Sequence, residues 1–250
     1  MVETILEIQN LSRYFGALAA INALELKVFR GSITALIGPN GAGKSTLFNL
    51  ITGNINPSSG KIIWKGRDIT ALPPHRISKM GIARSYQVTN IFSNLTTLEN
   101  VQFAVQSRKR FQNPFLRASG LRDVSERAYE ILDLLGLDGK EHDFGGNLSH
   151  GDQRRLEIAI SLATSPELLL MDEPTAGMSP AETDEMIALI PRISKDLTIV
   201  IVEHDMKVVM KLAQTISVLY YGEIIAEGTP EEIRNNKRVL EVYLGGDFSG

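Results

Sequence analysis

The sequence contains no cysteine, one tryptophan and four histidines among 250 residues. Without cysteine, the chain has neither disulfides nor thiolate metal ligands. It also lacks a long apolar run, since segments such as residues 198–202 (TIVIV) are far too short to cross a bilayer. Its 26 basic and 29 acidic residues leave a net charge of -3, which gives no global attraction to nucleic acid or acidic lipid. These absences exclude a disulfide-stapled domain, a membrane-spanning chain and a strongly basic nucleic-acid binder.

The remaining composition is that of a globular protein, with 43% hydrophobic and 22% charged residues. The length suits one large domain, or one domain with an inserted subdomain. The opening residues MVETILEIQN carry an acid at Glu3 and no apolar stretch, so we expect no secretory signal. Any work at a membrane would then require docking onto a protein already there.

Hydrophobic patterning predicts an α/β fold. Residues 5–31 read as short, partly alternating strands of an antiparallel sheet, and residues 60–70 as another hairpin. Residues 32–38, 168–172 and 198–204 are nearly continuous apolar runs, as expected of strands buried on both faces. Because helical segments separate these runs, we predict a mostly parallel sheet, with the antiparallel portion at the N-terminal side.

Helical periodicity predicts the rest of the chain. The predicted helices cover about residues 43–52, several stretches of 94–137, 149–164, 180–193 and a terminal segment opened by Thr229 and Pro230. A last hairpin turns near Tyr221 and Gly222.

The octapeptide GPNGAGKS, residues 38–45, matches the phosphate-binding pattern G-x-x-x-x-G-K-[ST] directly after a buried strand and before a helix. Its glycines let backbone N–H groups surround a phosphate at a helix N-terminus. Lys44 would reach the β- and γ-phosphates, and the Ser45 hydroxyl would ligate Mg²⁺. This pattern predicts a P-loop NTPase.

Acidic residues and a histidine follow the next two buried strands. Asp172 ends one strand, where it would hold Mg²⁺, and Glu173 comes next, placed to orient or deprotonate an attacking water. His204 follows the second strand and would contact the γ-phosphate, although a lone histidine is more often structural. We therefore expect a catalytic set of Lys44, Glu173 and His204.

The segment NLSHGDQRRLEIA, residues 147–159, begins with a capping-box pattern from Ser149 to Asp152. We expect the Ser149 hydroxyl to cap the helix and the Asp152 carboxylate to fold back. Gly151 is unusual because glycine in the first turn weakens a helix.

Two other phosphate-loop classes compete with an ATPase. A GTPase needs an N-K-x-D guanine reader, and the only NK lies in NNKR, residues 235–238, without the aspartate. A small-molecule kinase needs an arginine-rich lid, which the basic residues 108–122 would imitate.

Together GPNGAGKST, the Tyr86-Gln87 pair, LSHGD, LLLMDEPTAGMSP and IVEHD stand in the order of an ABC-transporter ATPase subunit. The chain resembles this family over essentially its whole length. The resemblance implies one domain over 1–250, with a nucleotide-binding core (1–93 and 161–250) and a helical subdomain (about 94–160) bearing the signature LSHGD. Two departures from the family signature L-S-G-G-Q are His150 and Asp152.

The resemblance also implies roles for particular residues. Phe15 would stack on adenine, with Tyr14 as a second candidate that reads equally well as a core residue. Gln87 would sense Mg²⁺ together with Ser45 and Asp172, and Ser179 would lie near a partner subunit. The implied nucleotide-binding set is Phe15, Gly38, Pro39, Asn40, Gly41, Ala42, Gly43, Lys44, Ser45, Thr46, Gln87, Ser149 and Gly151.

In this family two chains sandwich two ATP molecules head to tail, so that Ser149 and Gly151 would serve the partner's ATP. Whether the second ATPase subunit is a copy or a related chain stays open. His150 has two interpretations, an imidazole turned away from the nucleotide or a pH-sensitive extra donor.

The segments GIARSYQ, NLTTLENV and EGTPEEIRNNKRVLEVYLG most resemble ATPase subunits of branched-chain amino acid importers, although urea importers and lipopolysaccharide exporters share part of them. Such a subunit hydrolyses ATP with Mg²⁺ at the cytoplasmic face of the inner membrane, bound to permease subunits and indirectly served by a substrate-binding protein. A non-transport ABC ATPase and a regulator without turnover are the alternatives from other classes. Residues 107–122 contain five basic residues and no acid. This segment has three interpretations: a solvated loop, a surface that faces lipid or permease, and, less readily, a contact for nucleic acid.

Overall fold

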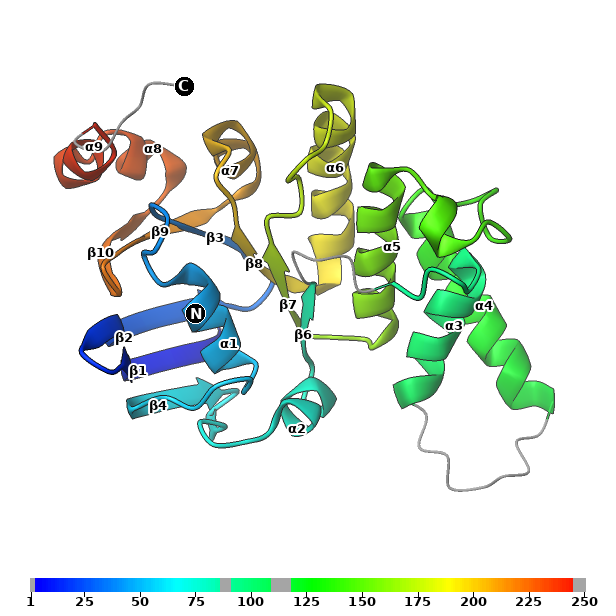
Figure 1. Cartoon of the computed structure of the whole chain (residues 1–250), viewed down its shortest axis with the longest axis horizontal. Coiled ribbons are helices and arrows are strands. Elements are labelled where there is room, and N and C mark those ends of the chain that lie inside the picture. Colours follow the sequence, from blue (N-terminus) through cyan, green and yellow to red (C-terminus); the bar gives the residue numbers. More distant parts are fainter. Residues whose placement is uncertain (1–2, 86–90, 109–117, 245–250) are drawn as a thin grey trace.

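The N-terminal strands form an antiparallel sheet, as the alternating pattern predicts (Figure 1). The computed structural model describes residues 3–85, 91–108 and 118–244. This first sheet has the order β2-β1-β4-β5. Its strands are β1 (Thr4–Phe15), β2 (Leu18–Phe29), β4 (Ser59–Trp64) and β5 (Arg67–Asp68).

A second sheet has the order β10-β9-β3-β8-β7-β6, and all of its neighbouring strands are parallel except β10, which is antiparallel to β9. The prediction of a mostly parallel sheet is therefore confirmed. Its strands are β3 (Ile33–Ile37), β6 (Ile82–Ser85), β7 (Leu168–Asp172), β8 (Thr198–Val202), β9 (Thr215–Tyr220) and β10 (Glu223–Gly228).

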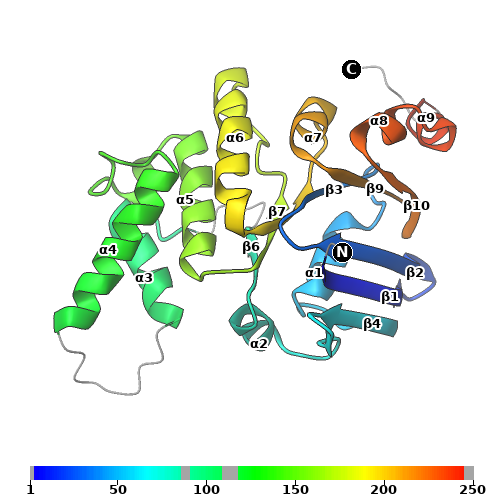
Figure 2. The same ribbon diagram turned by 180° about the vertical axis from the view of Figure 1, so that it is seen from behind.

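Helices connect the strands and cover the parallel sheet (Figures 1 and 2). The helices are α1 (Lys44–Ile51), α2 (Pro74–Lys79), α3 (Thr97–Arg108), α4 (Ala118–Leu134), α5 (His150–Ala163), α6 (Pro180–Ile193), α7 (Met206–Leu212), α8 (Pro230–Arg234) and α9 (Lys237–Leu244). None of the helices in the described part of the chain is both long and apolar enough to span a bilayer.

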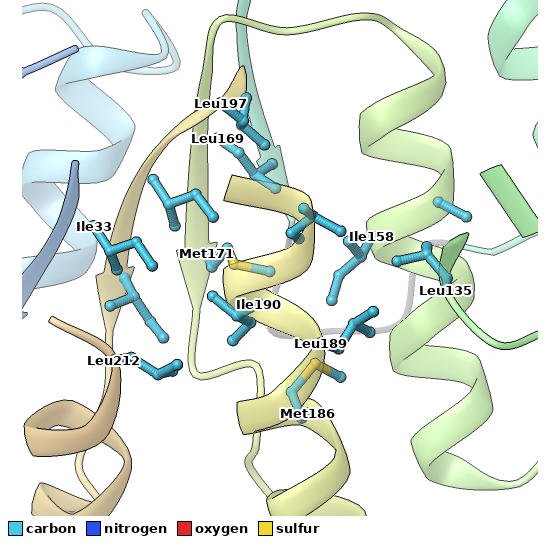
Figure 3. Close-up of a cluster of buried hydrophobic side chains, with 14 of the residues drawn as sticks. Ile33, Leu135, Ile158, Leu169, Met171, Met186, Leu189, Ile190, Leu197 and Leu212 are labelled. Atoms are coloured by element: carbon cyan, nitrogen blue, oxygen red, sulfur yellow. The ribbon is translucent and has the colours of Figure 1, made fainter. Parts of the chain in front are cut away.

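The continuous apolar strands separate two cores. In β7, Leu169 and Met171 face a cluster that includes helices α5 and α6, while Leu168 and Leu170 face a second cluster shared with α1 and the antiparallel sheet. Figure 3 shows the first cluster, with Met186, Leu189 and Ile190 of α6 against the strands. Burial of alternate residues on opposite faces is why these strands carry no polar alternation.

The helical part gathers at one end of the molecule. α5 packs against α3 and α4 and also against β6, so one continuous helix joins the helical end to the parallel sheet (Figures 1 and 2). The boundary of about 94–160 that we expect for the helical subdomain falls inside α5, and the subdomain limits stay a prediction.

The terminal helix predicted after Thr229 is in fact two helices. Asn235 ends α8, and the side-chain oxygen of Asn236 then accepts a hydrogen bond from the N–H of Val239 in the first turn of α9. Asparagine bonds its neighbouring backbone readily, so this pair interrupts the helix locally.

Candidate functional site

The carboxyl ends of three parallel strands meet at one edge of the second sheet. In the pairing register, Leu36 of β3 lies opposite Val202 of β8, and Val202 lies opposite Asp172 of β7. The phosphate-loop residues 38–43, Glu173 and His204 follow these strands, and Asp172 is the last residue of β7, so the fold brings together segments far apart in sequence. Ligands of open α/β sheets bind at this edge.

The loop of residues 38–43 lies tightly on neighbouring strands. A Cβ built on Gly38 would be 2.1 Å from the carbonyl oxygen of Leu219 in β9, and one built on Gly43 would be 2.4 Å from that of Ala20 in β2. The glycines are therefore required by packing behind the loop as well as by the expected phosphate in front of it.

Within the described chain, the helix that follows this loop has free N–H groups at its start. Gly43 is its N-cap, with φ of 112°, and among the described residues no side chain caps α1. The first-turn N–H groups therefore keep the capacity to bind an anion. Ser45 and Thr46 lie in this first turn.

Lys44 is the buried cation of the site. Its Nζ donates hydrogen bonds to the carbonyl oxygens of Gly38 (2.6 Å) and Pro39 (3.0 Å). Burial lowers the pKa of Lys44, while the charges of Glu173 and Asp172 oppose that shift. The end of β7 therefore contributes negative charge to the surroundings of this amine.

Glu173 adopts a left-handed backbone conformation with φ of 49°. This region is uncommon for a residue with a Cβ, and such conformations concentrate at functional sites. The N–H of Glu173 donates to the carbonyl oxygen of Val202 (2.9 Å), which fixes the turn against β8. The Oε1 of Glu173 lies 2.7 Å from Nε2 of His204, so the predicted base and histidine meet.

Asp172 has a partner that motif reading missed. Nη2 of Arg84, on β6, donates to Oδ2 of Asp172 over 2.7 Å, and the other arm of the guanidinium donates to Asn49 of α1. A charged residue within the otherwise apolar segment GIARS is the signal that could have indicated it.

Glu203 is a second missed residue. Its buried carboxylate accepts hydrogen bonds from the N–H (3.0 Å) and hydroxyl (2.6 Å) of Thr175. It thereby ties the segment after Glu173 to the segment that carries His204. Its position next to His204 in the sequence is the signal that could have indicated a role at the site.

The predicted capping box at Ser149 forms only in part. The Ser149 hydroxyl accepts from the N–H of Asp152 (3.1 Å), as predicted. The Asp152 carboxylate, however, accepts from the Ser149 hydroxyl (2.8 Å) and from Lys140 (2.5 Å). The carboxylate therefore folds back onto Ser149 as predicted, but it accepts from the hydroxyl and is shared with Lys140.

Ser149 and Gly151 lie at the start of α5, which packs against β6, whereas the phosphate loop follows β3. In the sheet order, β8 and β7 separate β3 from β6, so α5 and the phosphate loop lie at different places along the sheet. His150, whose role was open, points to its own chain: a Cβ built on Gly177 would be 3.2 Å from its Nε2.

The aromatic residues at the end of β1 are exposed. The exposed fraction is 45% for Tyr14 and 46% for Phe15, so the interpretation of Tyr14 as a core residue is wrong. The Arg13 guanidinium lies 4.5 Å from the centroid of the Phe15 ring, a cation–π contact. The predicted Gln87 lies outside the described residues.

Comparison with known proteins gives a consistent identity. A family model described as ABC transporter matches residues 21–176, and a model described as branched-chain amino acid ATP-binding cassette transporter matches residues 223–249. The high-affinity branched-chain amino acid transport ATP-binding protein BraF of Pseudomonas aeruginosa is 39% identical, over 98% of this chain and 99% of that protein.

Solved structures agree with the sequence relatives. An ATP-binding cassette of an ABC transporter in its ADP conformation superposes with a TM-score of 0.85 at 29% identity, covering 97% of this chain and 99% of that one. A dimeric cassette in a post-hydrolysis state, bound to ADP and Pi, gives 0.78 at 25% identity, covering 90% of this chain and 99% of that one. The chain therefore belongs to the ABC transporter family, as an ATP-binding cassette protein.

Proposed function

We propose that this chain is the ATP-hydrolysing subunit of an importer for branched-chain amino acids. The proposal depends on the meeting of Lys44, Glu173 and His204 at one sheet edge. This arrangement combines a cation that binds phosphate, a base for the attacking water and a hydrogen-bond donor for the γ-phosphate. The match of residues 223–249 to the branched-chain amino acid cassette model supports the cargo.

The phosphate loop would hold ATP through backbone N–H groups of residues 38–46 and through Lys44. The Lys44 amine now satisfies two loop carbonyls, and phosphate oxygens would replace these partners when ATP binds. Phe15 would stack on the adenine from the end of β1. Its exposure and its position as the last residue of β1 support this role.

Mg²⁺ would be held by Ser45, Asp172 and Gln87. The described residues of this set offer a hydroxyl and a carboxylate, which are the oxygen donors that Mg²⁺ prefers. When bound, Mg²⁺ neutralises charge on the β- and γ-phosphates.

Glu173 would take the proton of the attacking water. The His204 imidazole, 2.7 Å from Glu173, would orient the carboxylate and donate to the γ-phosphate as its charge develops.

Two ATPase subunits would form the working unit, each supplying Ser149 and Gly151 to the ATP bound by the other. The separation of α5 from the phosphate loop along the sheet of one chain supports a second chain as the source of these donors. The second subunit is a copy or a related chain. ATP binding would close the pair of subunits, and hydrolysis would release it. This cycle would drive permease subunits at the cytoplasmic face of the inner membrane. A substrate-binding protein would deliver cargo to the permease and so serve the ATPase indirectly.

The test is ATP-driven uptake of leucine, isoleucine and valine into vesicles that contain this chain and its co-purifying permease. We expect uptake to require ATP and to disappear with Lys44→Ala, while Lys27→Ala on the exposed face of β2 leaves it unchanged. Uptake of urea instead would overturn the assigned cargo. Recovery of the chain only with ribosomes would overturn the transport function. Undiminished hydrolysis by Lys44→Ala would overturn the assignment of ATP hydrolysis to this phosphate loop.

A further inference from the structure

A single carboxylate closes the first turn of α6. Oε2 of Glu182 accepts hydrogen bonds from the N–H (2.8 Å) and the hydroxyl (2.7 Å) of Ser179, and the N–H of Glu182 donates back to that hydroxyl (3.3 Å). This complete capping box folds the Glu182 side chain over the N-terminus of α6.

The other oxygen of Glu182 faces the first turn of α5. A Cβ built on Gly151 would lie 2.7 Å from Oε1 of Glu182, closer than real Cβ atoms approach, and a tight 3.1 Å from its Cδ. Gly151 is itself buried. Hydrogen bonding from Ser179, and to a lesser degree from the backbone of Gly151, lowers the pKa of Glu182. The carboxylate therefore serves two helix N-termini, where negative charge is favourable.

A second contact joins the same two segments. The His150 imidazole lies against Gly177, two residues before the cap of α6, and its charge also lowers the pKa of Glu182. The turn from Glu173 to Ser179 is itself hydrogen-bonded, through Ala176 to Glu173 (3.1 Å) and Met178 to Thr175 (3.2 Å). Glu173 is thus connected through an ordered turn to the edge of α5.

We propose that Glu182 is a positioning residue that holds the Ser149–Gly151 edge of α5 against the turn that follows Glu173. This inference rests on the proposed function, in which Glu173 acts on one ATP and Ser149 and Gly151 act on the ATP of the partner. Glu182 thus links the position of Glu173, the base for one ATP, to the position of Ser149 and Gly151, the donors for the ATP bound by the partner. Gly151 is a glycine because this carboxylate occupies the space of its side chain.

The chain contains a matched control in α8. Glu232 closes a capping box with Thr229 in nearly the same geometry, accepting from the Thr229 N–H (2.8 Å) and hydroxyl (3.0 Å). A Cβ built on Gly228 would lie 2.7 Å from its Oε2, and Gly228 directly precedes Thr229 rather than belonging to another helix. Removing Glu232 therefore removes a capping box without removing a bridge between helices.

The first test is thermal unfolding without nucleotide, in a double-mutant cycle of Gly151→Ala and Glu182→Ala. We expect Gly151→Ala to lower Tm in the wild-type background, because the new Cβ displaces the Glu182 carboxylate, and to lower it far less when Glu182 is already alanine. In the Glu232→Ala background the drop should equal that in wild type. Equal drops in all three backgrounds would overturn the bridge. This readout requires no ATPase activity, so it stands or fails separately from the proposed function.

The second test is ATP turnover by Glu182→Gln, which keeps an oxygen for the capping box but presents an amide to Gly151. We expect kcat to fall roughly 10- to 100-fold from misplaced donors, with the KM for ATP and the Tm nearly unchanged, and no effect from Glu232→Gln. Wild-type turnover by Glu182→Gln would overturn the positioning role. Should Glu182→Ala fail to fold, Glu182→Asp, whose shorter side chain withdraws the carboxylate from Gly151, replaces it in the thermal cycle.

Discussion

The guanidinium of Arg84 lies 2.7 Å from the carboxylate of Asp172, and the two side chains are only 8% and 4% exposed. The same guanidinium lies 5.4 Å from the centroid of the Phe48 ring and donates to Asn49. One arginine on β6 thus fixes the carboxylate proposed for Mg²⁺ relative to α1, the helix that begins at the phosphate loop.

Replacing Arg84 by methionine should strongly destabilise the fold, because it leaves the buried Asp172 carboxylate without its cation. We expect the free energy of unfolding, measured by urea denaturation, to fall by about 3–5 kcal/mol. Arg84→Met combined with Asp172→Asn should recover part of this loss. Arg127→Met, which removes an exposed pair with Glu130, should cost less than about 1 kcal/mol. Equal losses for Arg84→Met and Arg127→Met would contradict the prediction.

Glu173→Gln should abolish most turnover while leaving the fold intact, because the amide keeps the shape of the side chain but cannot take a proton. We expect steady-state ATP hydrolysis to fall roughly 10²- to 10⁴-fold, and an ATP-stabilised dimer to accumulate on a sizing column. Glu130→Gln, at an exposed position on α4, is the control and should hydrolyse at the wild-type rate. Unchanged hydrolysis by Glu173→Gln would show that another group acts as the base.

His204→Ala should slow hydrolysis roughly 10²-fold, the loss expected when one donor to a developing charge is removed. His204 is 45% exposed, so its removal should hardly change the thermal unfolding midpoint. Because His204 and Glu173 are in contact, the double variant should be no slower than Glu173→Gln alone. Multiplying losses would instead show that the two residues act independently.

Glu203 should make stability depend on pH in the opposite sense to an ordinary paired acid. Burial raises the pKa of Glu203 above its usual 4.5, although hydrogen bonds from Thr175 oppose the shift. As pH rises above 4.5, the unfolded chain loses this proton before the folded chain does, so folding is progressively disfavoured up to the folded pKa. The proton-linked contribution is complete at lower pH.

The measurement compares urea midpoints of wild type and Glu203→Gln over a pH series. The stability of wild type relative to this variant should decrease as pH rises from the unfolded pKa toward neutrality, by at most about 1.4 kcal/mol per pH unit. Glu130→Gln, whose wild-type side chain is exposed, should show no such trend. A constant or increasing difference between wild type and Glu203→Gln would refute the assignment.

Most of the fold was predictable because its signals are local. The apolar run at residues 33–37 and the capping serine of α6 act over a few neighbours, so β3 and α6 lie where periodicity places them. The split between α8 and α9 was missed for the opposite reason, since two adjacent asparagines interrupt a continuous helical pattern.

By itself, the sequence determined the phosphate loop and the types of group at the strand ends: a lysine, an acidic pair and a histidine, in the order of this family. The tertiary structure decided which of these side chains meet, and it supplied Arg84, Glu203 and Glu182, whose partners lie on other elements. It also showed that the carboxylate of Glu182 lies where a side chain at position 151 would be. Such contacts depend on packing between segments distant in sequence, and no short-range propensity encodes the distance between them.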